Sequence, residues 1–399
     1  MINSTNWLAQ CDAVIRLSLQ TILERKGASA AAAFGIAGVV TVLIGVLSIA
    51  QGFVRTLAVS GRPDTAVILR GGSDTEMMSL FGNEASRIIE ECQNVARSNR
   101  GALVSPELFV IIDLPKKDTR TDANVPLRGV EPMAFEVHDE IQFVGGRRFE
   151  PGRNEIIAGI GAVAQFAGLG LGSQVSVGRD KWTVVGHFRA GGGVAESEIW
   201  TDASVLQDVY QRGSSYQSIY ARLSSPAAFG KLKEELAANP RLNVKVLRQS
   251  EYYAAQSKIV SDLIHKLGTV IGGLMAVGAI FGALNTMYTA VAARRREIAT
   301  LRALGFGGAP VVISVLIESL ALAAMGGAFG AIIAYFAFDG IQSATLNWNS
   351  MSQVAFAFAV TPDLLARGIG WALAIGLIGG LLPAIRAARL PVARALQDY

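Results

Sequence analysis

The chain has 399 residues, of which 51% are hydrophobic and only 17% are charged, and its formal net charge is +4. This composition excludes a chain built only of soluble domains, in which about 25% of residues are charged. The excess basic residues lie at the edges of apolar runs, so the isoelectric point of 9.1 reflects membrane topology and gives no support to nucleic-acid binding. Cys11 and Cys92 lie in segments expected on opposite sides of a membrane, so neither a disulfide nor a cysteine metal site is expected.

The N-terminal region contains two predicted helices of different character. Residues 1–26 mix apolar and charged residues and predict an amphipathic helix on the cytoplasmic membrane surface; a solvated helical leader is the alternative. Residues 27–54 contain no charge, and their number exceeds the ~20 residues that a helix needs to cross the hydrocarbon core. Because this run is too long for the core of a signal peptide, we expect it to be the first transmembrane helix.

Between residues 55 and 250 the pattern changes to short segments separated by turn residues. Strands are predicted from β-branched content, and helices from their spacing of apolar residues. The predicted strands are 67–69, 108–112, 174–177 and 182–185, and the predicted helices are 86–97 and 229–238. We therefore expect an α+β extracytoplasmic domain of two subdomains, inserted after the first span.

The glycine-rich segments of this domain and the three histidines of the chain could suggest a phosphate-binding site or a metal site, but neither set has the required spacing. The glycine-rich pieces 168–172 and 191–193 lack the spacing and the strand-to-helix setting of a phosphate loop, so turns are expected. His138, His187 and His265 are scattered and predict no zinc site. A GxSxG nucleophile elbow is also absent, so the sequence predicts no catalytic residue and no metal ligand.

Three more membrane spans follow the inserted domain. Residues 251–293 contain no proline, so we expect a single helix that begins as a stalk outside the membrane and continues as the second span. At ~1.5 Å per residue, the proline-free stretch from residue 250 to residue 293 would extend roughly 66 Å as a helix, about twice the hydrocarbon thickness. The third and fourth spans are expected at 310–338 and 364–385. We therefore expect the chain to be an α-helical membrane protein with four transmembrane helices and an inserted α+β extracytoplasmic domain.

Basic residues predict the orientation, because positive charge stays on the cytoplasmic side. The loop at 294–309 holds four arginines and one glutamate, and the tail at 386–399 holds three arginines and one aspartate. The segment at 339–363 contains neither lysine nor arginine. The arginine-rich loop and both termini are therefore expected in the cytoplasm of a bacterial cell, and the inserted domain and residues 339–363 outside its inner membrane.

Several residues inside the spans have a predicted role. Glu318 is the one acid well inside a span; such residues are functional by default, although a structural pairing with a basic group near the cytoplasmic face is the favoured interpretation. Small residues allow close helix packing in lipid and are candidates for a dimer seam. These residues are Gly35 and Gly38 in the first span, or Gly326, Gly327 and Gly330 in the third.

The loop between the second and third spans has helical spacing, with an apolar edge beside basic residues. A short amphipathic helix of this kind is suited to a groove in a soluble partner, whereas anchoring to anionic lipid is the alternative. The chain contains no GxxxxGK[ST] motif and is not expected to bind ATP in the P-loop manner. The residues predicted to couple to a partner are Arg294, Arg295, Arg296, Glu297, Ile298, Leu301, Arg302, Leu304, Gly305 and Phe306.

This loop resembles that of the MacB/FtsX-type (type VII) ABC transporter permeases, which reads roughly R-R-x-E-I-x-x-L-R-A-L-G, from Arg294 to Gly305 here. Residues 317–319 and 326–330 are similar to the glutamate and small-residue pattern of the family's third span, and residues 383–392 to its closing P-A-x-x-A-A-x-x-x-P. The resemblance covers the full chain. It implies a homodimer bound to separate ABC ATPase subunits, which would hold ATP and Mg, while this chain holds no cofactor.

Two functions are consistent with this resemblance. One is ATP-driven export or extraction of a hydrophobic or amphipathic substrate, with a possible periplasmic adaptor and outer-membrane channel. The alternative is mechanotransmission, in which the extracytoplasmic domain regulates an envelope enzyme without transport. The size of the domain favours export, because the signalling members usually have smaller ones. A membrane-tethered enzyme or receptor without an ATPase conflicts with the loop, and no residue indicates the substrate.

Overall fold

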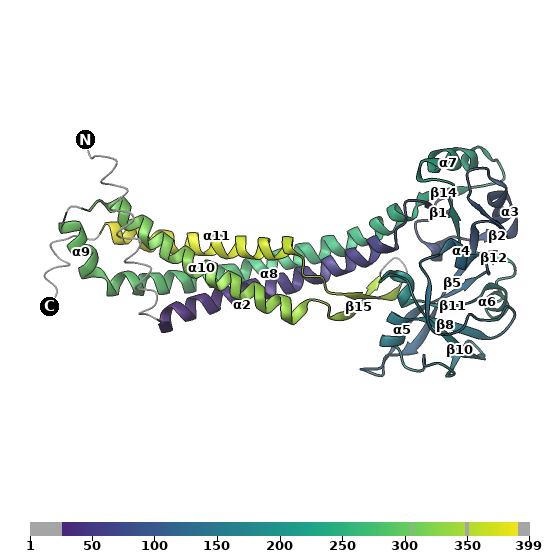
Figure 1. Ribbon diagram of the computed structural model, residues 1–399, viewed down its shortest axis with the longest axis horizontal. Helices are drawn as coiled ribbons and strands as arrows, with labels where there is room; N and C mark the ends of the chain where they lie inside the picture. The colour runs from purple at the N-terminus through teal and green to yellow at the C-terminus, as the bar shows by residue number, and fades with distance from the viewer. Residues whose placement is uncertain (1–25, 305, 348–350, 390–399) are drawn as a thin grey trace. The chain divides into compact units, whose positions relative to one another are not determined.

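The computed structural model describes residues 26–304, 306–347 and 351–389 and divides into two compact units (Figure 1). The membrane unit comprises residues 1–51, 263–340 and 358–399, and the inserted unit comprises residues 52–262 and 341–357. The amphipathic helix predicted at 1–26 lies outside the described residues except for Lys26. The end of the tail, from residue 390, also lies outside them.

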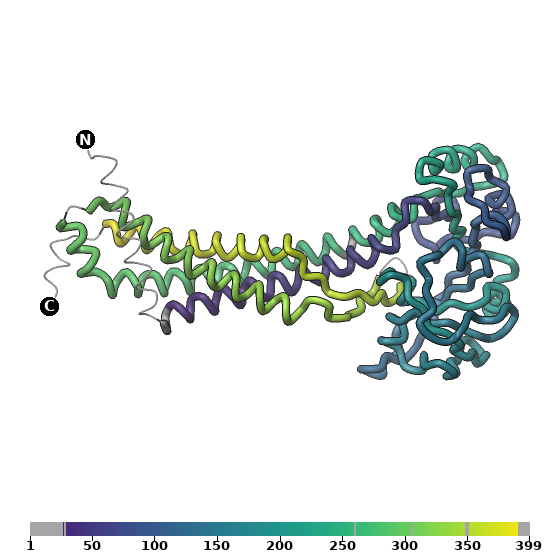
Figure 2. The backbone as a smooth tube through the Cα atoms, in the orientation of Figure 1, coloured from purple at the N-terminus to yellow at the C-terminus, as the bar shows by residue number. Residues whose placement is uncertain are grey.

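Four described helices are long and apolar enough to cross a membrane, as predicted. They are α2 (Lys26–Ser60), α8 (Gln249–Ala293), α10 (Gly308–Phe338) and α11 (Pro362–Ala388). A short helix, α9 (Arg295–Ala303), stands between α8 and α10. Figure 2 shows the backbones of the four long helices running alongside one another in the membrane unit. Since α8 has 45 residues, it extends about 68 Å at ~1.5 Å per residue.

Small residues hold α10 tightly between two other helices of the same chain. A Cβ atom on Gly326 would lie 2.6 Å from the carbonyl oxygen of Ala33, and one on Gly330 would lie 2.5 Å from that of Ala37. On the other side of α10, a Cβ on Gly327 would lie 2.7 Å from the Cβ of Ala372. Helix backbones approach this closely only where side chains are absent.

These contacts correct one alternative for the dimer seam. Gly326, Gly327 and Gly330 are buried within the chain, so the assignment of these three glycines to a seam with a second copy is wrong. Gly35 and Gly38 of α2 are exposed, and a Cβ on either would meet no described atom within 4 Å. They remain the predicted seam.

The inserted unit is built on a ten-stranded mixed sheet with the order β14-β1-β13-β5-β6-β11-β8-β10-β7, in which β9 pairs with β10. The bounds are β1 (Thr65–Arg70), β5 (Val104–Pro115), β6 (Asp122–Val130), β7 (Gln142–Gly146), β8 (Glu155–Gly159), β9 (Gln174–Val177), β10 (Asp180–Arg189), β11 (Ile199–Asp202), β13 (Ser218–Arg222) and β14 (Val244–Arg248). The two-stranded sheets pair β2 (Phe81–Gly82) with β12 (Ser215–Tyr216) and β3 (Arg97–Ser98) with β4 (Gly101–Ala102). The helices of this unit are η1 (Glu76–Met78), α3 (Asn83–Glu91), α4 (Ala134–Val137), α5 (Ile160–Gln165), η2 (Val194–Ser197), α6 (Ala203–Val209), η3 (Pro226–Ala228) and α7 (Phe229–Ala238).

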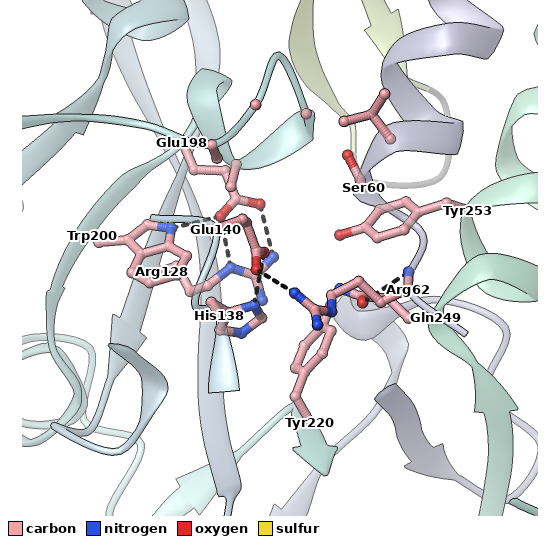
Figure 3. A pocket seen from close by; sticks show the side chains of 15 residues that line it. Ser60, Arg62, Arg128, His138, Glu140, Glu198, Trp200, Tyr220, Gln249 and Tyr253 are labelled. Carbon is pink, nitrogen blue, oxygen red and sulfur yellow. Dashed lines mark hydrogen bonds and ion pairs between the residues drawn. The ribbon is translucent and has the colours of Figure 1, made fainter. Parts of the chain in front are cut away.

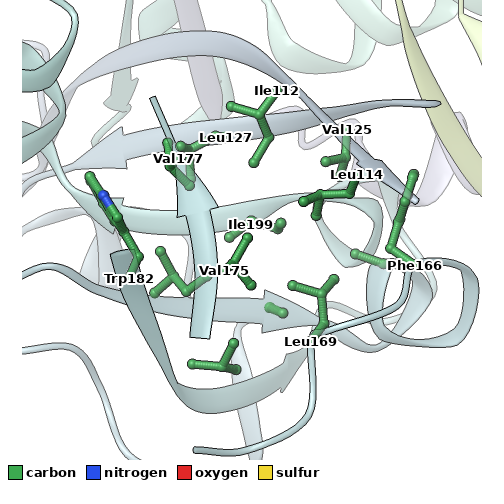
Figure 4. Packing of buried hydrophobic residues seen from close by; sticks show 14 of the residues in the cluster. Ile112, Leu114, Val125, Leu127, Phe166, Leu169, Val175, Val177, Trp182 and Ile199 are labelled. Carbon is green, nitrogen blue, oxygen red and sulfur yellow. The ribbon is translucent and has the colours of Figure 1, made fainter. Parts of the chain in front are cut away.

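Three hydrophobic cores lie along this sheet. One includes Trp182, Phe166 and Ile199 (Figure 4), a second includes Ile68 and Leu232, and a smaller third is built around Phe188 and Trp200. The long strand β5 joins the parts of the sheet that carry the first two cores, because its first residues pair with β13 and its remaining residues with β6. The two predicted subdomains therefore share one continuous sheet, rather than having two separate sheets.

Two segments differ from their predicted secondary structure. The helix predicted at 86–97 is α3, which ends at Glu91, because Cys92 takes an extended conformation and is buried together with Val95. Residues 339–363, expected as a loop, contain the strand pair β15 (Gln342–Asn347) and β16 (Ser352–Ala357). The hairpin packs in the inserted unit, where the Ala355 amide donates to the Ser197 hydroxyl over 2.8 Å.

An ion cluster, which the sequence did not predict, lies in the interior of the inserted unit. The Arg128 guanidinium on β6 donates to Glu198 over 2.7 and 2.8 Å, to Glu107 over 2.7 Å and to Glu76 over 2.9 Å. His138 Nε2 lies 2.7 Å from Glu107 Oε1. All five side chains are at most 8% exposed. We call Glu76, Glu107, Arg128, His138 and Glu198 the Arg128 cluster.

The charges of this cluster stabilise one another. Burial alone lowers the pKa of His138, but the charge and the hydrogen bond of Glu107 outweigh burial and raise this pKa to about 10. Burial raises the pKa of Glu107, but the positive charges of His138 and Arg128 lower it below its usual value. His138 is therefore an imidazolium cation at neutral pH.

This cation predicts a loss of stability in mild alkali. Because the folded-state pKa of His138 is raised, its contribution is complete below the unfolded-state pKa of 6.5 and declines as pH rises toward about 10. Between about pH 7 and 8.5 the free energy of unfolding is expected to fall by up to about 1.4 kcal/mol per pH unit. Tryptophan-fluorescence melting of the full chain in detergent measures this slope. This slope should be smaller in the variant His138→Gln. An equal slope in both proteins would contradict the assignment of His138 as a buried cation.

Candidate coupling site

The candidate coupling site is α9 with the turns on either side of it. The helix α8 ends at Ala293, and Arg294 then leaves helical geometry (φ −101°, ψ 14°) and becomes the N-cap of α9. At the other end the amide of Phe306 donates to the carbonyl of Leu301 over 3.1 Å, and α10 begins at Gly308. Gly305, predicted as part of this site, lies outside the described residues. Because the chain turns at Arg294, α9 is a separate helix from α8 and α10, with one face toward the long helices and one face away from them.

Arg294 attaches the start of α9 to the third long helix. Its side chain is 6% exposed, and its Nη1 donates to Glu318 Oε2 of α10 over 3.3 Å. Its Nε donates to Glu297 of α9 over 2.9 Å. Glu318 is also 6% exposed, so this ion pair is buried. The structural interpretation of Glu318, a pairing with a basic group at the end of its span, agrees with this contact.

The inner face of α9 packs against α8, α10 and α11. Ile298 is buried in a cluster with Val291, Val315 and Ala387. Near the other end of α9, Arg302 Nη1 donates to the carbonyl oxygen of Ala388 over 2.7 Å. A cation at the C-terminus of a helix satisfies its open carbonyls and complements its dipole. The position of α9 is therefore fixed from both ends.

The outer face differs from the predicted apolar edge. Ile298 is buried and Leu301 is half-buried, so neither belongs to an exposed edge as predicted. Arg294, predicted to contact a partner, also faces inward. Leu304 is 72% exposed. The exposed surface consists of Arg295, Arg296, Glu297, Thr300, Ala303 and Leu304, which we call the outer α9 face.

Among the described residues, no group of three or more His, Cys, Asp or Glu side chains could hold a metal ion. What the arrangement does provide is a rigid attachment: a solvent-facing helix whose buried side is joined to three long helices. Arg294 is the feature that sequence reasoning misplaced. Its position directly before the turn, one helical turn ahead of Ile298, was the available signal that it faces inward.

Two family models match the chain. The model described as "MacB-like periplasmic core domain" matches residues 29–239, more than half of the chain. The model described as "FtsX-like permease C-terminal" matches residues 269–392, which contain α9, α10 and α11. Together they cover α2, most of the inserted unit, the later part of α8 and the helices that follow it, and leave residues 240–268 unmatched.

Relatives support the same grouping. The uncharacterized ABC transporter permease YknZ of Bacillus subtilis is 24% identical over 96% of this chain and 98% of its own length. The macrolide export ATP-binding/permease protein MacB 1/2 of Paracoccus denitrificans is 24% identical over 96% of this chain, which spans 58% of that relative. The crystal structure of the periplasmic region of MacB from Actinobacillus actinomycetemcomitans matches 47% of this chain and 90% of its own, with 15% identity and a TM-score of 0.36. This chain belongs to the MacB/FtsX-type family of ABC transporter permeases and carries a MacB-like periplasmic core domain.

Proposed function

We propose that this chain couples ATP hydrolysis by a separate ATPase subunit to movements of its periplasmic domain, and that these movements drive export or extraction of a hydrophobic or amphipathic substrate. The ATPase binds the outer α9 face on the cytoplasmic side, and the permease acts as a homodimer. A periplasmic adaptor and an outer-membrane channel complete the proposed path. ATP and Mg belong to the ATPase subunit.

The observation that carries this proposal is the two-sided attachment of α9. Its outer face is exposed for a partner, while its inner face is joined to α10 by Arg294 and Glu318 and to α11 by Arg302. A force on the outer face would therefore move several long helices at once. The helix α8 contributes residues to both units. We infer that it carries the displacement toward the periplasmic domain.

Mechanotransmission without transport is the second candidate, because it would use the same α9 and α8. The names of several relatives favour export: MacB of Brucella abortus, 38% identical over 33% of this chain, is named for macrolide export. The two functions differ in one measurable respect. Export predicts that a transported amphiphile stimulates ATP hydrolysis in the reconstituted complex, whereas signalling predicts stimulation by an envelope enzyme and none by amphiphiles.

The first test is the substitution Leu304→Asp. A carboxylate on this 72% exposed position should disrupt an apolar contact with the ATPase without disturbing the fold of the permease. We expect at least a tenfold loss of ATPase subunit in copurification, which corresponds to about 1.4 kcal/mol. Membrane insertion and melting temperature should be unchanged.

The matched control is Leu171→Asp, which makes the same substitution at a 50% exposed leucine in a turn of the inserted unit. This variant should copurify with the ATPase as the wild type does. Full complex assembly by Leu304→Asp would show that the outer α9 face is not the docking surface.

A further inference from the structure

The membrane part of α8 is the least covered of the four long helices. Only 28% of its most apolar stretch is buried within the described chain, against 44% to 50% for α2, α10 and α11. Exposed residues recur along it at alternating steps of four and three residues, which is the heptad spacing of helices that pair side by side. These exposed positions, which we call the α8 seam face, are Leu267, Ile271, Leu274, Gly278, Phe281 and Asn285.

Lipid chains could cover the apolar members of this face, but Asn285 is a polar exception. The uncharged stretch from residue 267 to residue 293 extends roughly 40 Å at ~1.5 Å per residue, about 10 Å more than the hydrocarbon core. Asn285 lies roughly 14 Å along the helix before Arg294. This distance exceeds the ~5 Å by which the stretch extends beyond the core at each end, so Asn285 lies inside the hydrocarbon.

The side chain of Asn285 lacks a partner at this depth. Its backbone carbonyl accepts from the Thr289 hydroxyl over 2.9 Å, but no described residue bonds to its side-chain amide. An amide without a hydrogen bond is unfavourable in hydrocarbon, because neither water nor lipid tails can supply one. A lipid-covered face therefore does not account for this residue.

Polar side chains in apolar surroundings elsewhere bond within the chain. In the membrane unit the Ser319 hydroxyl of α10 donates to the carbonyl of Gly376 in α11 over 2.6 Å. In the inserted unit the guanidinium of Arg128 donates to Glu198 beside a cavity (Figure 3). By the same reasoning, the outward-facing amide of Asn285 points to a partner helix that covers the α8 seam face.

A second copy of this chain supplies such a helix. Both copies insert in the membrane with the same orientation, so a two-fold axis along the membrane normal places α8 beside α8, parallel and in register. Each residue near the axis then faces itself. An amide carries donors and an acceptor, so Asn285 can bond to Asn285 of the second copy. At Gly278 a Cβ would meet no described atom within 4 Å, so the second helix can approach closely there.

We propose that the α8 seam face is the contact between two copies of this chain, with the two Asn285 amides hydrogen-bonded across the axis. The two helices pair as a parallel, left-handed coiled coil, in which a single asparagine fixes the register and the number of helices. The inference rests on the homodimer of the proposed function and assigns a surface to it. It competes with Gly35 and Gly38 of α2, the seam predicted from the sequence.

Cysteine cross-linking in lipid vesicles tests the surface. In the full chain carrying Cys11→Ala and Cys92→Ala, the variants Leu274→Cys and Phe281→Cys are treated with a short bismethanethiosulfonate, which joins two nearby thiols. The matched control is Phe336→Cys, at an 82% exposed phenylalanine of α10. We expect at least about fivefold more cross-linked dimer at the two α8 positions than in the control, because heptad positions of paired helices lie in contact.

Removal of the amide tests the role of Asn285. Single-molecule photobleaching counts the copies per vesicle as the protein is diluted into lipid, and so measures the dissociation constant of the dimer. Asn285→Leu should raise this constant about 3- to 30-fold, the range for hydrogen bonds between helices in lipid. The matched control Thr269→Val removes a hydroxyl that bonds to the His265 carbonyl of its own helix over 2.7 Å, away from the seam face, and should leave the constant unchanged.

Melting temperatures confirm that every variant compared is folded. Cross-linking at the α8 positions no greater than in Phe336→Cys would show that lipid covers the face and would overturn the proposal. Stronger cross-linking in Gly38→Cys than at α8 would overturn it by moving the contact to α2, and equal dissociation constants for Asn285→Leu and the wild type would overturn the amide pair. A chain that is monomeric at every dilution and cross-links at none of these positions would refute the homodimer of the proposed function as well.

Discussion

Replacing Glu318 with alanine is expected to destabilise the membrane unit by about 3 kcal/mol, the lower end of the range for a broken buried ion pair, because the buried guanidinium of Arg294 loses the carboxylate of Glu318 and keeps that of Glu297. The loss should appear as a lower melting temperature of the full chain in detergent. Since Arg294 is also the N-cap of α9, the same substitution should release the start of this helix. ATP hydrolysis by the partner should then no longer respond to the permease.

A double-mutant cycle separates the ion pair from its surroundings. Arg294→Met and Glu318→Leu each remove one partner, and the double variant replaces the pair by apolar groups. Buried pairs are often replaced at little cost, so the double variant should be far more stable than either single variant. In the double variant ATP hydrolysis should nevertheless respond poorly to the permease, because apolar side chains do not fix the position of α9 by directional bonds. Additive losses of stability would show that the two residues act independently.

Much of this architecture could be predicted from the sequence, because it follows from local patterns. Uncharged runs predicted the four long helices, and the segment 229–238 matches α7 (Phe229–Ala238). The spacing around Arg295–Ala303 predicted a helix, but not which of its residues face inward. That depends on how the neighbouring helices pack on α9, and a helical pattern alone cannot say which apolar residues a tertiary contact will cover.

The Arg128 cluster could not be predicted, because its members are separated in the sequence. Glu76, Glu107 and Glu198 come from η1, β5 and the segment before β11, and only the sheet order brings them to Arg128. Each residue by itself resembles an ordinary surface charge. The hairpin of β15 and β16 was missed for a similar reason. In β16 the alternate residues Ser352, Val354 and Phe356 are buried, and the strand contacts segments far away in the chain.

Replacing Arg128 with methionine is expected to unfold the inserted unit, because three buried carboxylates lose their shared guanidinium. Breaking a buried pair costs about 3–5 kcal/mol, and a typical domain is stable by about 5–15 kcal/mol. Here one residue holds three acids, so the loss should lie at the upper end of that range or beyond. Hydrogen exchange in the full chain would show this as lost protection in β5, β6 and β11.

The matched control is Arg120→Met, which makes the same change at an exposed arginine between β5 and β6 and should preserve protection in all three strands. The comparison with Glu318→Ala then separates two parts of the proposed mechanism. Arg128→Met leaves α9 and its attachments intact, so the ATPase subunit should still copurify with a permease whose periplasmic domain no longer folds. Loss of copurification in Arg128→Met would mean that the periplasmic domain itself is needed for assembly. Docking could then not be assigned to the outer α9 face alone.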